Sequence, residues 1–203
     1  MKADRMVTTM VAAVVLLTAT ACQGDSPKPP PVTSTPIASP TPTPSPTPAA
    51  LPDFTKWQDE PADIPIPPMP AAAKKHTKAG SVAFGKYYVA MINYALLTGD
   101  NKGLGELAAA ECNICQSNAA GFISTFTKKQ SYLGDPRYTI TGSREEDLSS
   151  TSAGASIFVT SKPFKIRTKS KVSSISGQRL ALVFRLRWTK TAWSITDYTV
   201  GDI

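Results

Sequence analysis

Three cysteines are the residues of this chain whose spacing points most directly to chemistry. Cys112 and Cys115 have the Cys-x-x-Cys spacing, which is compatible with a structural disulfide, a redox-active dithiol or part of a zinc site. A redox-active pair needs a βαβ context that this region lacks, and zinc needs four ligands. The single histidine, His76, stands in a proline-rich stretch where we expect it to be solvated. A structural disulfide is the main prediction, with redox chemistry as the alternative.

The third cysteine, Cys22, ends an uncharged stretch, residues 6–21, that follows Lys2 and Arg5. A charged start, an apolar stretch and small residues before a cysteine are typical of a bacterial lipoprotein signal, although Ala19 stands where a bulky aliphatic residue is usual. The stretch is shorter than the roughly 20 apolar residues of a membrane-spanning helix. We predict a signal peptide over 1–21, lipid such as palmitate on Cys22, and export to the outer face of the cell membrane. An ordinary cleaved signal peptide is the alternative.

No arrangement of residues typical of an enzyme is visible in the sequence. It holds no Gly-rich phosphate loop, no Gly-x-Ser-x-Gly motif and no histidine cluster. The adjacent acidic residues Glu145, Glu146 and Asp147 are expected in an exposed loop rather than as a converging acid–base pair. We therefore predict no catalytic residues, no metal and no cofactor.

Basic residues give the clearest indication of a partner, since the net charge is +7. If the strand predicted there extends far enough, alternate basic side chains from 165 to 171 project from one face, and those from 179 to 187 lie opposite an apolar row. Anionic wall polymers or an acidic envelope protein are the natural counterparts of such a surface outside the cell, and nucleic acid is not expected. A solvated outer face that opposes aggregation is the alternative. The predicted basic face comprises Lys165, Arg167, Lys169, Lys171, Arg179, Arg185 and Arg187.

The elements that must position these residues lie in the second part of the chain. Residues 22–52 hold 11 of the 18 prolines, so we expect a disordered Pro/Ser/Thr-rich linker after the lipidated cysteine. Residues 53–76 are still punctuated by proline and are expected to form an extended arm lying on the fold. Residues 77–203 are long enough for one globular domain with its own core.

Helical periodicity and then alternation predict an α+β domain of three N-terminal helices followed by a curved four-stranded antiparallel sheet. The long first helix is expected to lie on one face of the sheet. The helices are predicted at 80–97, 101–110 and 114–129, and the strands at 137–143, 156–168, 178–189 and 192–200. The expected core comprises Leu180, Leu182, Phe184, Leu186, Trp188, Trp193 and Ile195.

This order of elements resembles the NTF2-like, or cystatin-like, cone fold. A second resemblance is carried by the segments Pro67-Pro68-Met69-Pro70, Ala73-Lys74-Lys75-His76-Thr77, Ala83-Phe84-Gly85-Lys86-Tyr87-Tyr88-Val89, Ile92-Asn93-Tyr94-Ala95, Thr98-Gly99-Asp100 and Cys112-Asn113-Ile114-Cys115. Through these segments the sequence from about Pro65 to the carboxyl terminus resembles a family of actinobacterial lipoproteins of unknown function. The resemblance implies fold and location and brings no activity.

Two functions follow as expectations. The first is a membrane-anchored, wall-facing interaction module that binds protein or anionic polymer through the basic face and catalyses nothing. The alternative is a carrier of a small ligand or lipid, because cone folds can hold a ligand between helix and sheet. Polar-tipped residues expected to line that cavity are Tyr88, Asn93, Tyr94 and Asp197.

Overall fold

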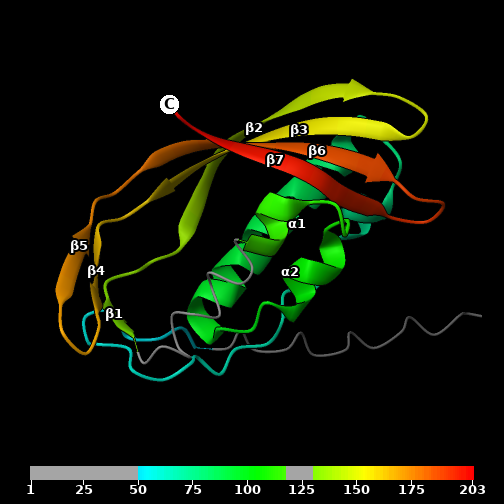
Figure 1. The fold of residues 1–203 in the computed structure, drawn as a ribbon. Coiled ribbons are helices and arrows are strands. Elements are labelled where there is room, and N and C mark those ends of the chain that lie inside the picture. The colour runs from blue at the N-terminus through cyan, green and yellow to red at the C-terminus, as the bar shows by residue number, and fades with distance from the viewer. Residues whose placement is uncertain (1–49, 118–129) are drawn as a thin grey trace, which may run out of the picture. The chain divides into compact units, whose positions relative to one another are not determined.

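The computed structural model describes residues 50–117 and 130–203, which belong to one compact unit, residues 46–203 (Figure 1). The predicted signal peptide, Cys22, the linker up to residue 49 and most of the third predicted helix lie outside the described residues. The elements in chain order are η1 (Ala71–Lys74), α1 (Lys78–Thr98), α2 (Lys102–Leu107), β1 (Ser131–Leu133), β2 (Tyr138–Leu148), β3 (Ser152–Ser161), β4 (Phe164–Arg167), β5 (Val172–Ile175), β6 (Arg179–Trp188) and β7 (Trp193–Asp202). No helix among the described residues is long and apolar enough to cross a membrane.

Helix α1 begins and ends as its sequence indicates. The Thr77 side chain accepts a hydrogen bond from the Gly80 N–H, which satisfies one of the free donors of the first turn. Gly99 ends the helix in the left-handed conformation, with φ 72°, where a side chain would be strained. The helix predicted at 80–97 is confirmed, and so is the short helix that follows it, as α2. Residues 113–117 are also helical.

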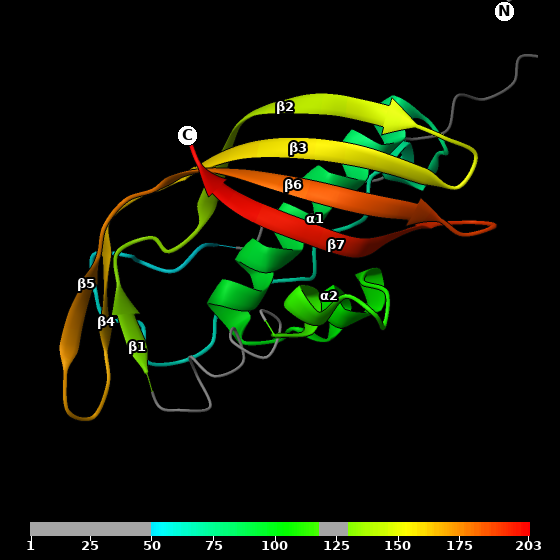
Figure 2. The same cartoon turned by 45° about the horizontal axis from the view of Figure 1, so that its top comes forward.

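The predicted four-stranded antiparallel sheet is confirmed, in the order β2-β3-β6-β7. It lies across α1 in both views of the fold (Figures 1 and 2). Buried and exposed residues alternate along β6, so Leu182 and Phe184 face the helix while Arg185 faces solvent. Helix and sheet approach closely at Gly85, where a Cβ would lie 3.2 Å from Ile157 and 3.3 Å from Phe184.

A second antiparallel sheet, in the order β1-β4-β5, was not predicted from the sequence. The single strand predicted over 156–168 is wrong in extent, because the chain leaves the first sheet after Ser161 and enters the second at Phe164. Pro163 stands between the two strands and has no N–H to give to either ladder. The β4–β5 hairpin therefore belongs to a small sheet of its own.

The proline-rich arm and the loop after α2 each bond to the outer edge of a sheet. Gln58 and Tyr132 exchange two backbone hydrogen bonds, of 2.8 and 3.3 Å, along the free side of β1. Ala108 forms a parallel bridge with Ile195, and the Ala109 N–H donates to the Ile195 carbonyl at 2.8 Å on β7. Both contacts satisfy backbone groups that an edge strand would otherwise leave open to pairing.

Candidate binding surface at the small sheet

The positive charge of the chain is concentrated in one continuous segment. Between Asp147 and Asp197 the sequence contains nine basic residues and no acidic residue, against a net charge of +7 for the whole chain. This segment forms strands β3, β4, β5 and β6. A cationic surface at these strands is therefore neutralised only where a distant part of the chain brings a carboxylate to it.

The β4–β5 hairpin carries three lysines with no ion pair among the described residues. The turn is closed by the Thr168 N–H, which donates to the Lys171 carbonyl at 2.8 Å, so Lys169 lies at the tip. Strand β4 ends at Arg167, which corrects the expectation that one strand face carries all four basic residues from 165 to 171. We name Lys165, Lys169 and Lys171 the hairpin lysines, and all three are exposed.

Arg167 is held by the arm and does not belong to the free basic surface. Its guanidinium donates to Asp59 at 2.7 Å and to the Ser131 hydroxyl at 3.1 Å, and it lies 4.4 Å from the centre of the Trp57 ring. Hydrogen bonds from Ser131 and then from Arg167 lower the pKa of Asp59. The contact to Trp57 adds a cation–π attraction. Arg167 thus fastens the arm to the small sheet.

The other predicted basic residues lie on a different sheet. Arg179, Arg185 and Arg187 alternate along the exposed face of β6, as predicted. Arg187 pairs with Glu111 at 2.6 Å, whereas Arg179 and Arg185 have no ion pair among the described residues. Since β4 and β6 belong to separate sheets, the single basic face expected from the sequence is divided in two.

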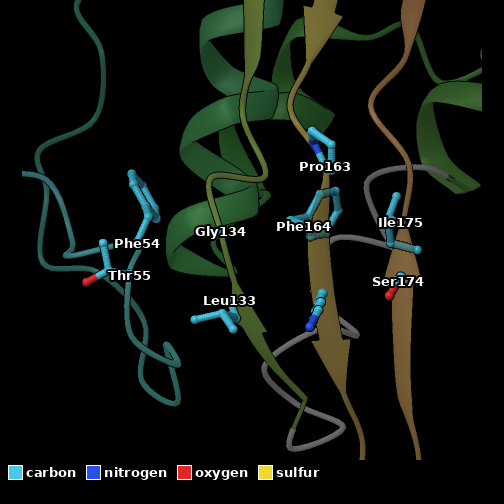
Figure 3. Close-up of a pocket in the computed structure, with 9 residues that line it drawn as sticks. Phe54, Thr55, Leu133, Gly134, Pro163, Phe164, Ser174 and Ile175 are labelled. Carbon is cyan, nitrogen blue, oxygen red and sulfur yellow. The ribbon is translucent and has the colours of Figure 1, made fainter.

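An apolar groove of about 320 Å³ adjoins the hairpin lysines (Figure 3). It lies where the arm, the end of β1 and the β4–β5 hairpin meet. Its volume falls at the lower end of the range for small-molecule sites, and its polar side chains are few. The residues that line it are Phe54, Thr55, Leu133, Gly134, Pro163, Phe164, Lys165, Ser174 and Ile175.

The cavity expected between helix and sheet is filled around Tyr88. The Tyr88 ring is 2% exposed and packs edge-on against Phe184 and Tyr198, with ring centres 5.6 and 6.2 Å apart. Burial, and then the nearby Tyr198, raise the pKa of Tyr88. Asp197 pairs in register with Arg185 on the exposed face of the sheet, so it shares no cavity with Tyr88.

Asn93 and Tyr94 do come together, at the surface rather than inside a cone. Both line a hollow of about 180 Å³ between α1 and the arm. The Asn93 amide already bonds to the backbone of β2: it donates to the Tyr138 carbonyl at 2.9 Å and accepts from the Tyr138 N–H at 2.8 Å. The Tyr94 hydroxyl donates to Asp100 at 3.3 Å. Of the four predicted pocket residues, only these two share a concave site.

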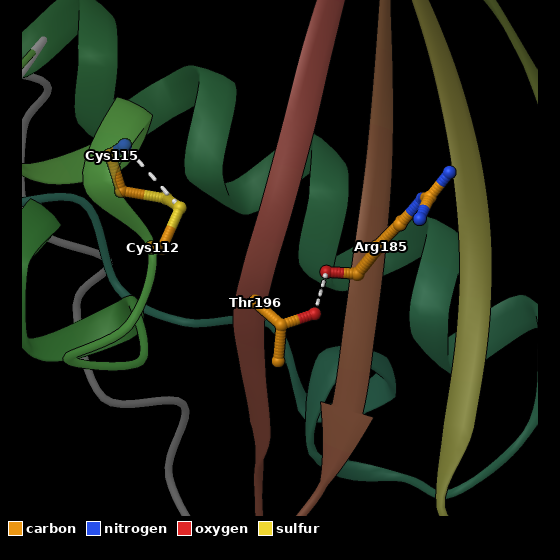
Figure 4. The surroundings of a disulfide bond; sticks show 4 residues. All are labelled: Cys112, Cys115, Arg185 and Thr196. Carbon is orange, nitrogen blue, oxygen red and sulfur yellow. Dashed lines mark hydrogen bonds between the residues drawn. A yellow bond between two sulfur atoms is a disulfide. The ribbon is translucent and has the colours of Figure 1, made fainter.

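The predicted disulfide between Cys112 and Cys115 is confirmed (Figure 4). Their Cα atoms are 5.3 Å apart, and both side chains are buried in the main core. The bridge joins Cys112, which directly precedes the helical residues 113–117, to Cys115 within them. Such a short loop restricts the unfolded chain by about 2 kcal/mol, which is less than longer disulfide loops contribute. The bridge thus fixes the first turn of these helical residues.

Two sequence interpretations of polar residues are wrong. His76 is half-buried rather than fully solvated, because its ring stacks on Trp188 with centres 4.9 Å apart and its Nε2 atom is buried with no hydrogen-bond partner among the described residues. The acidic triplet is not in a loop, because it lies within β2, where Glu146 accepts from the Ser156 hydroxyl at 2.8 Å. The described residues contain no group of three or more His, Cys, Asp or Glu side chains placed to hold a metal ion.

Sequence reasoning missed the groove and the free edge of β5. Phe54, Leu133 and Ile175 lie far apart in the sequence, and only the pairing of β1, β4 and β5 brings them to one site. The one local signal was the polar run Thr168-Lys169-Ser170-Lys171, which indicates an exposed hairpin tip.

Comparison with known proteins identifies a family but no activity. The sequence profile of a family of unknown function, DUF6318, matches residues 57–199. No curated protein matches. Among solved structures, the intermembrane space region of the chloroplast protein ARC6 is similar at 12% identity and a TM-score of 0.48, covering 64% of this chain and 99% of that chain. A putative calcium/calmodulin-dependent protein kinase II association domain from Xanthomonas campestris is similar at 15% identity and a TM-score of 0.37, covering 62% and 86%.

Proposed function

The chain belongs to DUF6318, a family of unknown function, and from that premise we propose that it is an exported, lipid-anchored protein that binds an anionic partner. In this proposal Cys22 carries the lipid, residues 23–52 hold the domain away from the membrane, and the domain is an NTF2-like variant. The proposed binding surface consists of the hairpin lysines. The proposal includes no catalysis. The actinobacterial origin of the family stays a prediction from the sequence.

The absence of acidic residues between Asp147 and Asp197 is the observation that carries this proposal. Two arginines of the segment are paired by carboxylates from elsewhere, Arg167 by Asp59 and Arg187 by Glu111. The hairpin lysines are exposed and lack such a partner among the described residues. A cluster of like charges on a short hairpin costs repulsion that an anionic partner would relieve, and its field attracts that partner from a distance of about 10 Å.

Binding of defined polyanions by the full-length chain in mild detergent tests the proposal. Fluorescence anisotropy of labelled poly-L-glutamate and of labelled polyphosphate would be measured across a series of salt concentrations. We expect the triple variant Lys165→Ser, Lys169→Ser, Lys171→Ser to weaken binding about tenfold or more, which corresponds to about 1.4 kcal/mol. Raising the salt concentration should weaken binding by the wild-type protein much more than by this variant.

A matched control removes three lysines from other exposed positions. Lys74, Lys78 and Lys102 lie in η1, α1 and α2, and their replacement by serine lowers the net charge by the same amount. Binding should then change by less than about threefold. An equal loss in both triple variants would show that net charge alone attracts the polymer, and the hairpin proposal would fail.

A carrier of a small apolar ligand is the second candidate function, because of the groove in Figure 3. The groove combines apolar walls from Phe54, Leu133 and Ile175 with the amine of Lys165, a combination that suits an apolar molecule with one anionic group. Native mass spectrometry of the protein purified from its own membrane distinguishes the two functions. A stoichiometric small molecule that stays bound at high salt would favour the carrier.

A further inference from the structure

The two outer edges of the small sheet differ in their backbone hydrogen bonding. On the β1 side, Gln58 of the arm bonds to both main-chain groups of Tyr132. On the β5 side, no described segment pairs with the strand. One edge is therefore closed by the chain itself, and the other is open as far as the described segments extend.

The register of the hairpin identifies which groups of β5 are open. Thr168 and Lys171 form the hydrogen-bonded pair next to the turn, and Phe164 pairs with Ile175 farther along. Bonded and non-bonded pairs alternate in an antiparallel ladder, so Ser173 and Ile175 bond to β4, while the N–H and C=O groups of Val172 and Ser174 point away from it. The same alternation in β1 points the groups of Tyr132 outward to Gln58, in agreement with the observed bonds.

The surroundings of this open edge define the chemistry of a partner strand. Lys169 and Lys171 precede the edge residues, and Lys165 lies opposite Ser174 in the ladder. Ser174 and Ile175 also line the apolar groove, so the groove adjoins the edge (Figure 3). Val172 is 53% exposed. A partner thus meets two free pairs of backbone groups, three cations and one apolar hollow.

We propose that β5 is a docking edge for an extended acidic peptide segment of another envelope protein, which adds to the small sheet as a further strand. Backbone groups of the peptide bond to Val172 and Ser174, its carboxylates face the hairpin lysines, and one apolar side chain enters the groove. Addition of a strand gives affinity through the main chain and specificity through alternate side chains. This inference rests on the proposed function and names the partner of that same surface.

Amide hydrogen exchange of the full-length chain, with and without peptide, tests the inference. The probe is a short peptide of alternating Glu and Val residues with one central Phe. We expect it to slow exchange of the Val172 and Ser174 amides about tenfold or more, because these donors become bonded. The amides of Ser173 and Ile175 are already bonded to β4 and serve as internal controls with smaller changes. A peptide of the same sequence carrying N-methyl groups on consecutive residues should give no protection.

Variants at Ser174 test the same edge from the protein side. Ser174→Pro removes an N–H that makes no bond within the sheet, so the hairpin can keep its ladder while losing an edge donor. We expect it to weaken peptide binding about tenfold, whereas Ser174→Ala should bind like the wild type. If Ser174→Pro does not fold, the N-methylated peptide supplies the same comparison.

The outcomes separate this inference from the proposed function. Salt-sensitive binding of poly-L-glutamate without protection of Val172 and Ser174 would overturn the docking edge and leave the proposed function standing. Failure of every acidic probe to bind would overturn both. Equal binding of the N-methylated peptide would exclude strand addition. Concentration-dependent protection of Val172 and Ser174 without peptide would assign the edge to a second copy of the chain and overturn the inference.

Discussion

Asn93 is the polar residue that most directly ties α1 to the main sheet. Its side chain donates to the Tyr138 carbonyl and accepts from the Tyr138 N–H. It thus makes the two hydrogen bonds that a neighbouring strand would make to the first residue of β2. Asn93→Ala leaves both backbone groups without these partners. We expect a loss of about 1–3 kcal/mol in the free energy of unfolding, measured by urea denaturation.

Tyr94→Phe is the neighbouring control. It removes a hydroxyl that donates to the Asp100 carboxylate at 3.3 Å on the exposed side of the helix. Its effect should stay within about 0.5 kcal/mol of the wild type. Equal losses in the two variants would show that Asn93 has no special part in holding β2.

The attachment of the arm through Asp59 should depend on pH. Hydrogen bonds from Ser131 and Arg167 lower the pKa of its carboxyl below the usual value of 3.8. A lowered pKa in the folded state means that the attachment is complete above about pH 5 and is lost as the pH falls through the lowered value. The protection factors of the Gln58 and Tyr132 amides should therefore fall in acid.

Asp59→Asn separates this effect from the titration of other carboxyls. The variant should hold the arm less firmly at neutral pH, with lower protection of Gln58 than the wild type. Its remaining protection should depend less on pH between about 5 and 3, because the titrating group is absent. An unchanged acid profile in the variant would assign the pH dependence to another carboxyl.

At the scale of elements, Gly85 sets how closely α1 approaches the sheet. A Cβ at this position would lie 3.2 Å from Ile157 and 3.3 Å from Phe184, both of which are fully buried. Gly85→Ala should lower the free energy of unfolding by about 1–3 kcal/mol, because the core must shift to admit a methyl group. Gly105→Ala in α2, where nothing lies within 4 Å of the added atom, should instead be neutral or slightly stabilising. Urea denaturation of both variants checks the contrast, and a stable Gly85→Ala would show that the core yields easily.

The sequence predicts the main sheet and α1 well because their patterns are long and local. Alternation from Leu180 to Leu186 locates the buried face of β6, and Gly99 marks the end of α1. The strand predicted from Ser156 onward fails at Pro163, since alternation reports extended backbone and does not report which sheet the backbone joins. Strand β1 has only three residues and no pattern to detect.

The candidate site was predicted only in part for the same reason. The sequence shows that Lys165, Lys169 and Lys171 are cationic, and lysine side chains are rarely buried without a partner, so their exposure could be expected. It does not show that Arg167 forms an ion pair with Asp59, which lies more than a hundred residues away in the chain. The free edge of β5 depends on the strand order of the small sheet, which long-range pairing determines.

At the scale of the whole molecule, the proposed anchor and the domain are expected to make separate contributions. The described residues form a hydrophobic core between α1 and the main sheet, so we expect the domain to fold without the proposed lipid. If Cys22 carries the proposed lipid, Cys22→Ser in the native host should move the protein from the membrane fraction to the soluble or secreted fraction, because the variant cannot be acylated there. Its unfolding temperature should match that of the wild type within about 2 °C. Retention in the membrane fraction would contradict lipidation at Cys22.

The attachment of the arm has a mechanical consequence. Along the chain, the first described contacts between the arm and the small sheet are those of residues 54–59, through Phe54, Gln58 and Asp59. If the protein is tethered through its amino-terminal part, tension along that tether reaches the small sheet before it reaches the main sheet. The bonds at Gln58 and Asp59 would then yield first, as the weakest link in series. A stretched tether would loosen the groove and the β1 edge while the main core stays folded.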